Sequence, residues 1–509
     1  MRRAATTLSV VCLVQAVLAI DSTGTDVAIP DLSRDLDANV SGIYWVKCAY
    51  ALGIMATVPI YGALGGRFGR KRWFLTGLAI FTIGSALSAL SNDLSTLIAA
   101  RALQGAGGGA LLALGLSLLA TAFSGRALVR ATGIWAIAGS VGFCLGPIVA
   151  GIIVQSEGWQ WIFWVNVPLC LVAGVVGAVA IREGHDSPEN VLDPLGQLIL
   201  GATLALIVLL TSGLTMVVTE DDRRIIGMCL VGLIALLLAV MLLRSRNRAR
   251  PGQVLPGTLM QGPFLVALIV GLVANFALIT SLYYQSQLVQ ETRGFDPVEA
   301  GLLYAPLAIA VAVSGLSVGR VVQRLGYRLT ISAGLVTAAC GATVIAVVAA
   351  GANTAWLLVG NFLIGAGAGA AIPANSAVGL GVPARSAAAA ASTMLAVGRQ
   401  LGTTVGLTMV VGVAVVATDS AWANFASRLP ADTQSSAIEA VRVGHLAEVA
   451  EVGGPLAATA AARSFELGVM WAYLATALAL LVTAAYTLRG LRGVDARLEV
   501  ADEPSCEPS

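Results

Sequence analysis

Two carboxylates stand inside the first long apolar run of the chain, Asp21 and Asp26 in the stretch DSTGTDVAIP (21–30). A carboxylate in hydrocarbon costs roughly 2.5–3.5 kcal/mol on insertion scales, so an aspartate in such a run is a functional candidate by default. Asp21 precedes Pro30 by nine residues, about 14 Å of helix, which predicts a position near the middle of a bilayer. A carboxylate there needs a proton, an ion partner or a water-filled cavity.

The second carboxylate, Asp26, follows Asp21 by five residues, which is about 140° around a helix. The two side chains should point to different faces, so a paired-carboxylate acid/base site is not expected. Lys47 stands four residues into the next apolar run, and Asp26 stands four residues before the end of the first. At the rise of a helix, both side chains would lie about 6 Å from the outer boundary of the membrane. We predict an Asp26–Lys47 ion pair in an outer gate, with two separate surface charges as the alternative.

Composition predicts the elements that hold these residues. Of 509 residues, 57% are hydrophobic and 11% are charged, with a mean hydropathy of +0.85. Soluble domains carry about 25% charge, so the chain is predicted to be an all-α polytopic membrane protein. It has no basic tract with interleaved aromatic residues, which argues against nucleic acid as a partner. The scattered cysteines and the two histidines, His185 and His445, predict no metal site and no cofactor.

Apolar runs of about 20 residues are needed to cross ~30 Å of hydrocarbon. Lys and Arg collect in the loops on the amino-terminal side, so both termini are predicted to be cytoplasmic. We expect a multi-pass, monomeric protein in the plasma membrane of a bacterium. Fourteen apolar runs are long enough to span, at 7–30, 43–65, 73–90, 94–120, 129–154, 161–181, 194–215, 224–243, 263–289, 300–322, 329–350, 354–382, 387–417 and 467–488.

An internal repeat divides the chain. The segment 62–70 matches 319–328 at an offset of 257 residues, and 101–109 matches 361–369 at an offset of 260. Two parallel six-span halves are the architecture of the major facilitator fold. We therefore expect a six-helix bundle at 1–190, two additional central helices at 191–250, a second six-helix bundle at 251–497 and a disordered tail at 498–509. A long outer loop is expected at 418–463, with an amphipathic helix on the membrane surface at 433–452.

The cytoplasmic loop between the second and third spans contains glycines for a tight turn and basic residues that face the anionic leaflet. It resembles the signature loop of the major facilitator superfamily, G-x-L-a-D-r-x-G-r-k. The sequence departs from this pattern at the acidic position, which is Gly66 here and Gln323 in the second half. In the family that aspartate helps to latch the inner gate, so we expect a different closure here. The matching residues are Gly62, Arg67, Gly69, Arg70 and Lys71.

Two further motifs lie in the spans. Arg101 stands about seven residues into the fourth span, and its R-x-x-Q-G-x-G setting resembles the family motif whose arginine takes part in proton coupling. An arginine that extends to the interface is the alternative. Small residues at 142, 146 and 151 allow close helix packing, and proline predicts a kink. The residues Gly142, Gly146, Pro147 and Gly151 resemble the antiporter signature of drug exporters.

Other segments resemble the 14-spanner drug/proton antiporters that include quaternary ammonium exporters: WQWIFWVNVP (159–168), DPLG (193–196), PVEAG (297–301) and RQLG (399–402). The resemblance covers nearly the whole chain. It places Asp21 on the family's membrane-embedded carboxylate, so we expect Asp21 to bind proton and substrate alternately, with a structural carboxylate as the alternative. Asp26 stands where that family usually has asparagine. Arg399 is the other deep charge, which could stabilise ionised Asp21 or attract an anionic group.

These expectations lead to a proton-coupled exporter of amphipathic, cationic drugs or toxic compounds that works by alternating access and is not an enzyme. One alternative is a dedicated exporter of a self-made antibiotic or another narrow metabolite. A second alternative is a membrane sensor that does not transport. The predicted partners are a small-molecule substrate, protons and the lipid bilayer. Candidates for the cavity wall are Tyr50, Asn275, Tyr283, Tyr284, Gln287 and Asn375.

Overall fold

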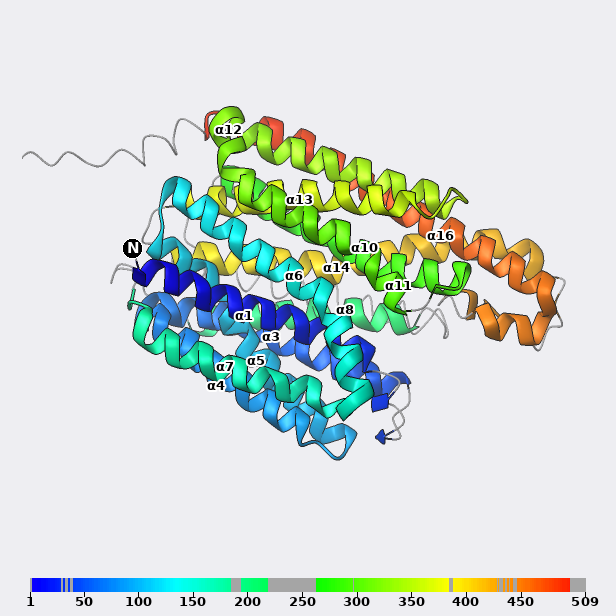
Figure 1. Cartoon of the computed structure of the whole chain (residues 1–509), viewed down its shortest axis with the longest axis horizontal. Helices are drawn as coiled ribbons and strands as arrows, with labels where there is room; N and C mark the ends of the chain where they lie inside the picture. Colours follow the sequence, from blue (N-terminus) through cyan, green and yellow to red (C-terminus); the bar gives the residue numbers. More distant parts are fainter. Residues whose placement is uncertain are drawn as a thin grey trace, which may run out of the picture.

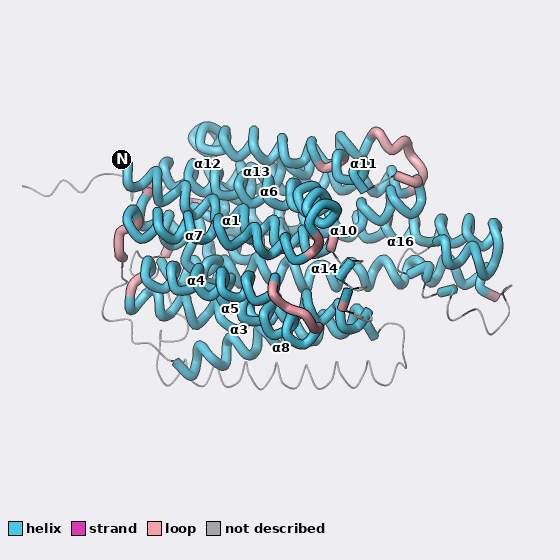
Figure 2. The backbone as a smooth tube through the Cα atoms, turned by 60° about the horizontal axis from the view of Figure 1, so that its bottom comes forward, coloured by secondary structure: helices cyan, strands magenta, loops and turns pink. Residues whose placement is uncertain are grey.

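The computed structural model of the chain describes residues 2–28, 31–32, 35–36, 40–184, 194–217, 262–295, 297–383, 388–427, 429, 434, 437–438, 440–442 and 446–494. Within these ranges all regular secondary structure is helical (Figure 2), which confirms the all-α expectation. Long apolar helices satisfy every backbone hydrogen bond within one segment, as a chain in hydrocarbon requires.

The first half of the chain forms a group of helices coloured from blue through cyan to sea green in Figure 1. The last of the first-half helices, α8, packs against α3, where Gly201 lies against the backbone of Ala56. The helices are α1 (Arg2–Val27), α3 (Val40–Phe68), α4 (Arg70–Ala89), α5 (Leu94–Ala122), α6 (Gly125–Glu157), α7 (Gln160–Ala180) and α8 (Pro194–Val217).

The second half forms the green-to-red group in Figure 1. It contains α10 (Gly262–Arg293), α11 (Pro297–Leu302), α12 (Ala305–Ala349), α13 (Trp356–Gly381), α14 (Ala388–Ala426) and α16 (Leu446–Gly490). The 45-residue segment α12 contains two expected spans. Its backbone breaks between them at Gly326, where φ is +76°. Only glycine adopts that conformation without strain, so one residue turns the chain back.

Nine helices of the described part are long and apolar enough to cross a membrane, and three shorter apolar helices lie at 127–143, 194–210 and 409–423. One of the nine, at 299–349, contains two of the expected spans. The expected span at 224–243 lies outside the described residues. The number of fourteen spans and the domain boundaries predicted from the sequence therefore stay predictions.

The packing of glycines confirms the internal repeat. In the first half, Gly105 of α5 lies against the backbone of Tyr50, and in the second half Gly365 of α13 lies against the backbone of Leu307. Leu307 follows Tyr50 by 257 residues, and Gly365 follows Gly105 by 260, which are the two offsets seen in the sequence. Further equivalent contacts join Gly77 to Gly107, and Gly334 to Gly367.

The segment 418–463, expected to be a loop, is helical at both ends, because α14 continues to Ala426 and α16 begins at Leu446. The apolar residues expected to face the membrane surface are instead covered within the protein. Val441 and Val449 are buried in a cluster with Trp422 of α14. The expectation of a surface helix is wrong for these residues, because neighbouring helix ends bury the same apolar area that a membrane would.

The two halves contact each other toward the end of the molecule at which α1 begins, called here the N-terminal end. The Ser392 hydroxyl donates a 2.6 Å hydrogen bond to the carbonyl oxygen of Ala113. The Thr132 hydroxyl lies 3.4 Å from the carbonyl oxygen of Pro373. These contacts join α14 to α5 and α6 to α13, which brings the halves together at one end.

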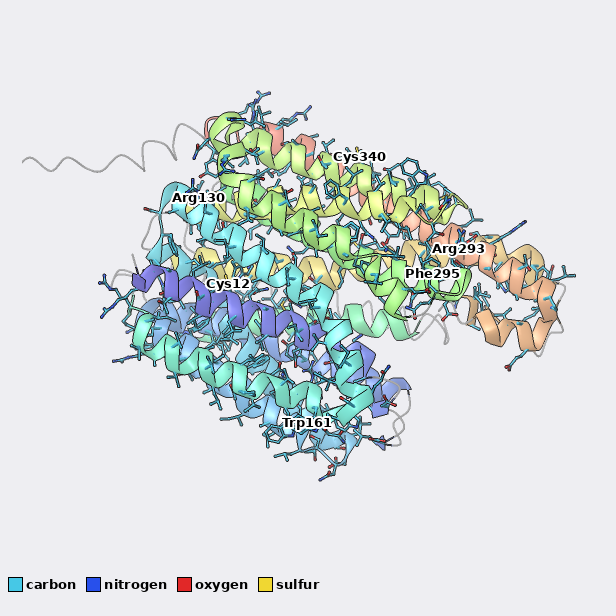
Figure 3. The ribbon with its side chains drawn as sticks, in the orientation of Figure 1. Cys12, Arg130, Trp161, Arg293, Phe295 and Cys340 are labelled. Carbon is cyan, nitrogen blue, oxygen red and sulfur yellow. The ribbon has the colours of Figure 1, made fainter. Side chains whose placement is uncertain are left out.

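At the opposite end, Figure 3 shows Arg293 and Phe295 where α10 ends, whereas Arg130 lies near the N-terminal end. The Arg293 guanidinium makes a 3.2 Å ion pair with Glu466 of α16. It also donates to the carbonyl oxygen of Val348 in α12. These bonds join three helices of the second half to one another.

Candidate functional site

The carboxylate of Asp21 is completely buried among polar side chains of the first half. Arg101 Nη1 lies 2.9 Å from Oδ2, in an ion pair. Two uncharged amides donate to Oδ1: Gln104 Nε2 at 2.9 Å and Asn166 Nδ2 at 2.8 Å. Three donors around one carboxylate satisfy a charge that hydrocarbon alone would not tolerate.

A serine connects the two amides on the far side of the carboxylate. Ser85 Oγ accepts from Asn166 Nδ2 at 3.1 Å and lies 3.3 Å from Gln104 Nε2. Its own hydroxyl donates to the carbonyl oxygen of Phe163 at 2.9 Å. The network therefore joins α1, α4, α5 and α7 around Asp21.

Arg101 is held by aromatic rings as well as by charge. Its guanidinium lies 4.2 Å from the ring centre of Tyr50 and 5.4 Å from that of Phe163. It also donates to Gln104 Oε1 at 2.6 Å. Only 2% of the side chain is exposed, so the alternative of an arginine that extends to water is wrong. Charge, rings and amides together offset the desolvation of the guanidinium.

The start of α5 sets the position of Arg101. Asp93 caps this helix, because its carboxylate accepts from the backbone N–H of Thr96 at 2.9 Å and from the Thr96 hydroxyl at 2.6 Å. These hydrogen bonds lower the pKa of the Asp93 carboxyl, which keeps the cap ionised. Arg101 and Gln104 stand three residues apart on the helix and so share one face.

Three members of this network were not predicted as site residues: Ser85, Gln104 and Asn166. Gln104 belongs to the motif that contains Arg101, and its i+3 spacing was the available signal. Asn166 is a single amide in an apolar run, which also carried a signal. Ser85 gave none, because serine is common in apolar helices, where its hydroxyl can bond to the helix backbone.

The Asp26–Lys47 pair stays a prediction. Asp26 lies in helix α1, but its side chain lies outside the described part. Lys47 lies in α3 with an exposed side chain. The side chain of Pro147 lies outside the described part as well.

Arg399 lies outside the network around Asp21. It packs against a helix of the other half of the molecule. Its guanidinium is 5.0 Å from the ring centre of Trp135, on α6. Asn375 of α13 lies near it, because a Cβ built at Gly271 would be 3.6 Å from Asn375 Nδ2 and 3.7 Å from Arg399 Cγ. The arginine paired with Asp21 is Arg101, whereas Arg399 faces an aromatic ring.

The other candidates for the cavity wall occupy different settings. Tyr50 lies under Arg101, in the network. Asn275 donates to the carbonyl oxygen of Gly271 in its own helix, at 2.8 Å. Tyr283 is 40% exposed and lies edge-on to the buried ring of Tyr284, with 5.0 Å between ring centres. Gln287 is half-buried.

The antiporter motif brings α6 close to α1. A Cβ built at Gly142 would lie 2.7 Å from the carbonyl oxygen of Ala16, and one at Gly146 would collide with Thr23. Both glycines therefore permit close helix contact near Asp21. Gly151 differs, because a Cβ there would meet no described atom within 4 Å.

The signature loop is a single-glycine turn at Gly69, where φ is +114°. Arg70 is buried and donates to the Thr121 hydroxyl at 3.2 Å. The backbone N–H of Lys71 donates to the carboxylate of Glu183 at 2.9 Å, and Lys71 Nζ donates to the carbonyl oxygen of Ala178. Glu183 thus places a negative charge at the start of α4, which the helix dipole favours.

The other two residues of the loop motif differ in burial. Arg67 is exposed, with its guanidinium 5.4 Å from the ring centre of Phe68. Gly62 lies against the side chain of Thr393, in the other half. Close approach at Gly62 adds to the contacts that hold the N-terminal end together.

In the described part of the chain no group of three His, Cys, Asp or Glu side chains could hold a metal ion. The network around Asp21 contains one arginine, two amides, a hydroxyl and two aromatic rings, and Arg399 lies outside it. Such a set can exchange protons and bind charged or aromatic molecules.

Comparison with known proteins adds family evidence. The model of the family described as the Major Facilitator Superfamily matches residues 11–407. The multidrug resistance protein Stp of Mycobacterium tuberculosis is 30% identical over 399 residues, which cover 77% of this chain and 72% of that protein. The multidrug efflux pump LfrA of Mycolicibacterium smegmatis is 28% identical over 406 residues, which cover 79% of each chain.

Solved structures of similar fold are more distant in sequence. The proton:xylose symporter XylE superposes with a TM-score of 0.63 at 13% identity, over 98% of both chains. The human organic anion transporter MFSD10 superposes with a TM-score of 0.58 at 15% identity, over 95% of this chain and 99% of that one. At these identities the likeness concerns the fold alone.

Proposed function

This chain belongs to the Major Facilitator Superfamily, and we propose that it is a proton-coupled exporter of amphipathic, cationic drug-like compounds. As a member of that superfamily it is a multi-pass membrane transporter of small molecules rather than an enzyme. The proposal includes a monomer with both termini in the cytoplasm, so that the N-terminal end is the inner end. It also includes the 14-span architecture of the drug/proton antiporters.

The observation that carries proton coupling is the ion pair between Asp21 and Arg101, buried on every side. Protonation of Asp21 removes the negative charge, so Arg101 loses its counter-ion while the amides of Gln104 and Asn166 remain. A buried cation without a partner is unfavourable, which gives protonation a means to change the helix packing. Each elementary charge moved across the membrane is worth about 2.3 kcal/mol per 100 mV.

A cationic cargo would compete with Arg101 for the carboxylate of Asp21. Binding of cargo and binding of a proton would then exclude one another at the same oxygen atoms, as exchange requires. The contacts between the halves at the N-terminal end support alternating access, because they close that end while α1, α5 and α7 hold the carboxylate.

The test uses everted vesicles with an imposed pH gradient. A panel of lipophilic cations is added to vesicles that contain wild-type protein or the Asp21→Asn variant. Collapse of the gradient with the wild type alone supports both exchange and the role of Asp21. If neither protein responds to any cation, proton-coupled cation export is excluded.

Two related proteins favour a narrower cargo as a second candidate. The tetracenomycin C resistance and export protein of Streptomyces glaucescens is 29% identical over 324 residues, which cover 63% of this chain. The methylenomycin A resistance protein of Bacillus subtilis is 32% identical over 323 residues. Each is named for one compound, so a dedicated exporter of a natural product is the second candidate. A panel of natural products in the same vesicles distinguishes the two.

The outer gate is a separate part of the proposal. We propose that Asp26 and Lys47 pair at the outer ends of α1 and α3. The double variant Asp26→Lys with Lys47→Asp should transport better than either single variant. A double variant as impaired as the single ones would exclude the pair.

A further inference from the structure

Arg399 is a half-buried positive charge that lies outside the Asp21 network. Asp21 already has a cationic partner in Arg101 at 2.9 Å. Among the described residues, Arg399 Nη2 is buried and has no hydrogen-bond acceptor. Its guanidinium instead faces the ring of Trp135. A guanidinium N–H without an acceptor in a buried setting is costly, so a ligand that supplies an anionic oxygen would be bound there.

An acceptor without a donor lies beside this arginine. Asn375 Nδ2 donates to the carbonyl oxygen of Ala267 at 2.9 Å, which fixes the orientation of the amide. Its Oδ1 is buried and has no donor in the described part of the chain. Asn375 and Arg399 both lie beside Gly271, because a Cβ built there would be 3.6 Å from Asn375 Nδ2 and 3.7 Å from Arg399 Cγ. One unpaired donor and one unpaired acceptor therefore lie on neighbouring helices.

The third member of this cluster belongs to the other half. Trp135 lies on α6, whereas Arg399 lies on α14 and Asn375 on α13. If the halves rock apart, as the proposed alternating access requires, Trp135 and the guanidinium separate, and the ring of an aromatic molecule can enter between them. The indole ring offers the same cation–π contact that an aromatic cargo would make.

We propose that Arg399, Asn375 and Trp135 form a subsite for an acidic oxygen carried on an aromatic cargo, such as an aromatic carboxylate. The inference rests on the proposed export function and narrows its substrate class. Arg399 binds the carboxylate, Asn375 Oδ1 accepts from a neighbouring hydroxyl, and the ring of the cargo packs against Trp135. A zwitterion satisfies both this subsite and Asp21, so a permanent cation without an acidic group is the poorer ligand.

The experiment compares one rhodamine dye as its free acid and as its methyl ester, which share the same cationic aromatic body. Binding to purified full-length protein in nanodiscs is measured by fluorescence anisotropy, with empty nanodiscs to correct for partition into lipid. We expect the wild type to bind the free acid about tenfold more tightly than the ester, as one charge-assisted hydrogen bond predicts. Equal binding, or tighter binding of the ester, overturns the proposal without any variant.

The variants assign the preference to the arginine. Arg399→Gln should remove the preference, so that acid and ester bind with equal affinity, whereas Arg399→Lys should keep most of the preference for the acid. Arg489→Gln, at an exposed arginine near the end of α16, is the matched control and should bind as the wild type does. A preference that survives Arg399→Gln overturns the proposal. Failure of vesicle export with the acid preference intact counts against the proposed function alone.

Discussion

Ser392 donates a hydrogen bond to the carbonyl oxygen of Ala113, with 2.6 Å between the two oxygen atoms. Both residues are fully buried, and the bond joins α14 of the second half to α5 of the first. The sequence has Gly66 and Gln323 at the acidic positions of the signature loop. Among the described residues, the halves contact at the N-terminal end through this hydroxyl–carbonyl bond and through close packing at Gly62, and neither signature-loop position carries a carboxylate.

Removal of the Ser392 hydroxyl should weaken closure of the N-terminal end. One neutral hydrogen bond is worth about 0.5–1.5 kcal/mol, so Ser392→Ala should shift the closed–open equilibrium about twofold to tenfold. The readout is a cysteine at Ser117, buried one turn beyond Ala113, on a background with the native cysteines replaced. Its alkylation by an impermeant maleimide in everted vesicles should accelerate.

The control for this experiment is Ser420→Ala, which removes an exposed hydroxyl that donates to the carbonyl oxygen of Val416 in its own helix, α14. It should leave the alkylation rate unchanged. If Ser392→Ala behaves in the same way as Ser420→Ala, the bond does not hold the N-terminal end closed.

The Asp21–Arg101 pair should show strong thermodynamic coupling. Breaking a buried pair on one side typically costs about 3–5 kcal/mol, because the remaining charge loses its partner. Asp21→Asn and Arg101→Gln should each lower the unfolding temperature in detergent, and the double variant should lose clearly less than the sum of both. Additive losses would show that the two side chains act independently.

The glycines of the repeat should be equally intolerant of a methyl group. A Cβ at Gly105 or Gly365 would collide with the backbone of Tyr50 or Leu307. Gly105→Ala and Gly365→Ala should both reduce the yield of monodisperse protein in size-exclusion chromatography, whereas Gly151→Ala should not. A normal yield for only one of these two variants would contradict the equivalence of the two glycine contacts.

Gln285 tests the cost of burying an amide that has no hydrogen-bond partner among the described residues. Its side chain is fully buried, and neither amide atom has a hydrogen-bond partner in the described part of the chain. Gln285→Met keeps the shape and removes both polar atoms, so the unfolding temperature should stay level or rise. Gln104→Met, which removes bonds to Asp21 and Arg101, should lower it. A large loss for Gln285→Met would indicate that the amide binds water or cargo.

The sequence by itself determined the helical class, the repeat and the importance of single charged residues. The reason is that hydrocarbon acts on each segment separately: it demands long apolar helices and makes Asp21, Arg101 and Arg399 conspicuous. The offsets of 257 and 260 residues were also readable, because close helix contact requires glycine at fixed places. Each of these signals lies within one stretch of chain or in the likeness of two stretches.

Only the tertiary structure decided which of these residues meet. Arg101 rather than Arg399 pairs with Asp21, and Ser85 and Asn166 complete its surroundings. Asp21 and these partners come from four helices, and their meeting depends on the rotation of each helix about its axis, which the packing of all neighbours sets. The same holds for 433–452, whose apolar face was visible in the sequence. Whether a membrane or Trp422 covered that face was settled by where the helix ends lie.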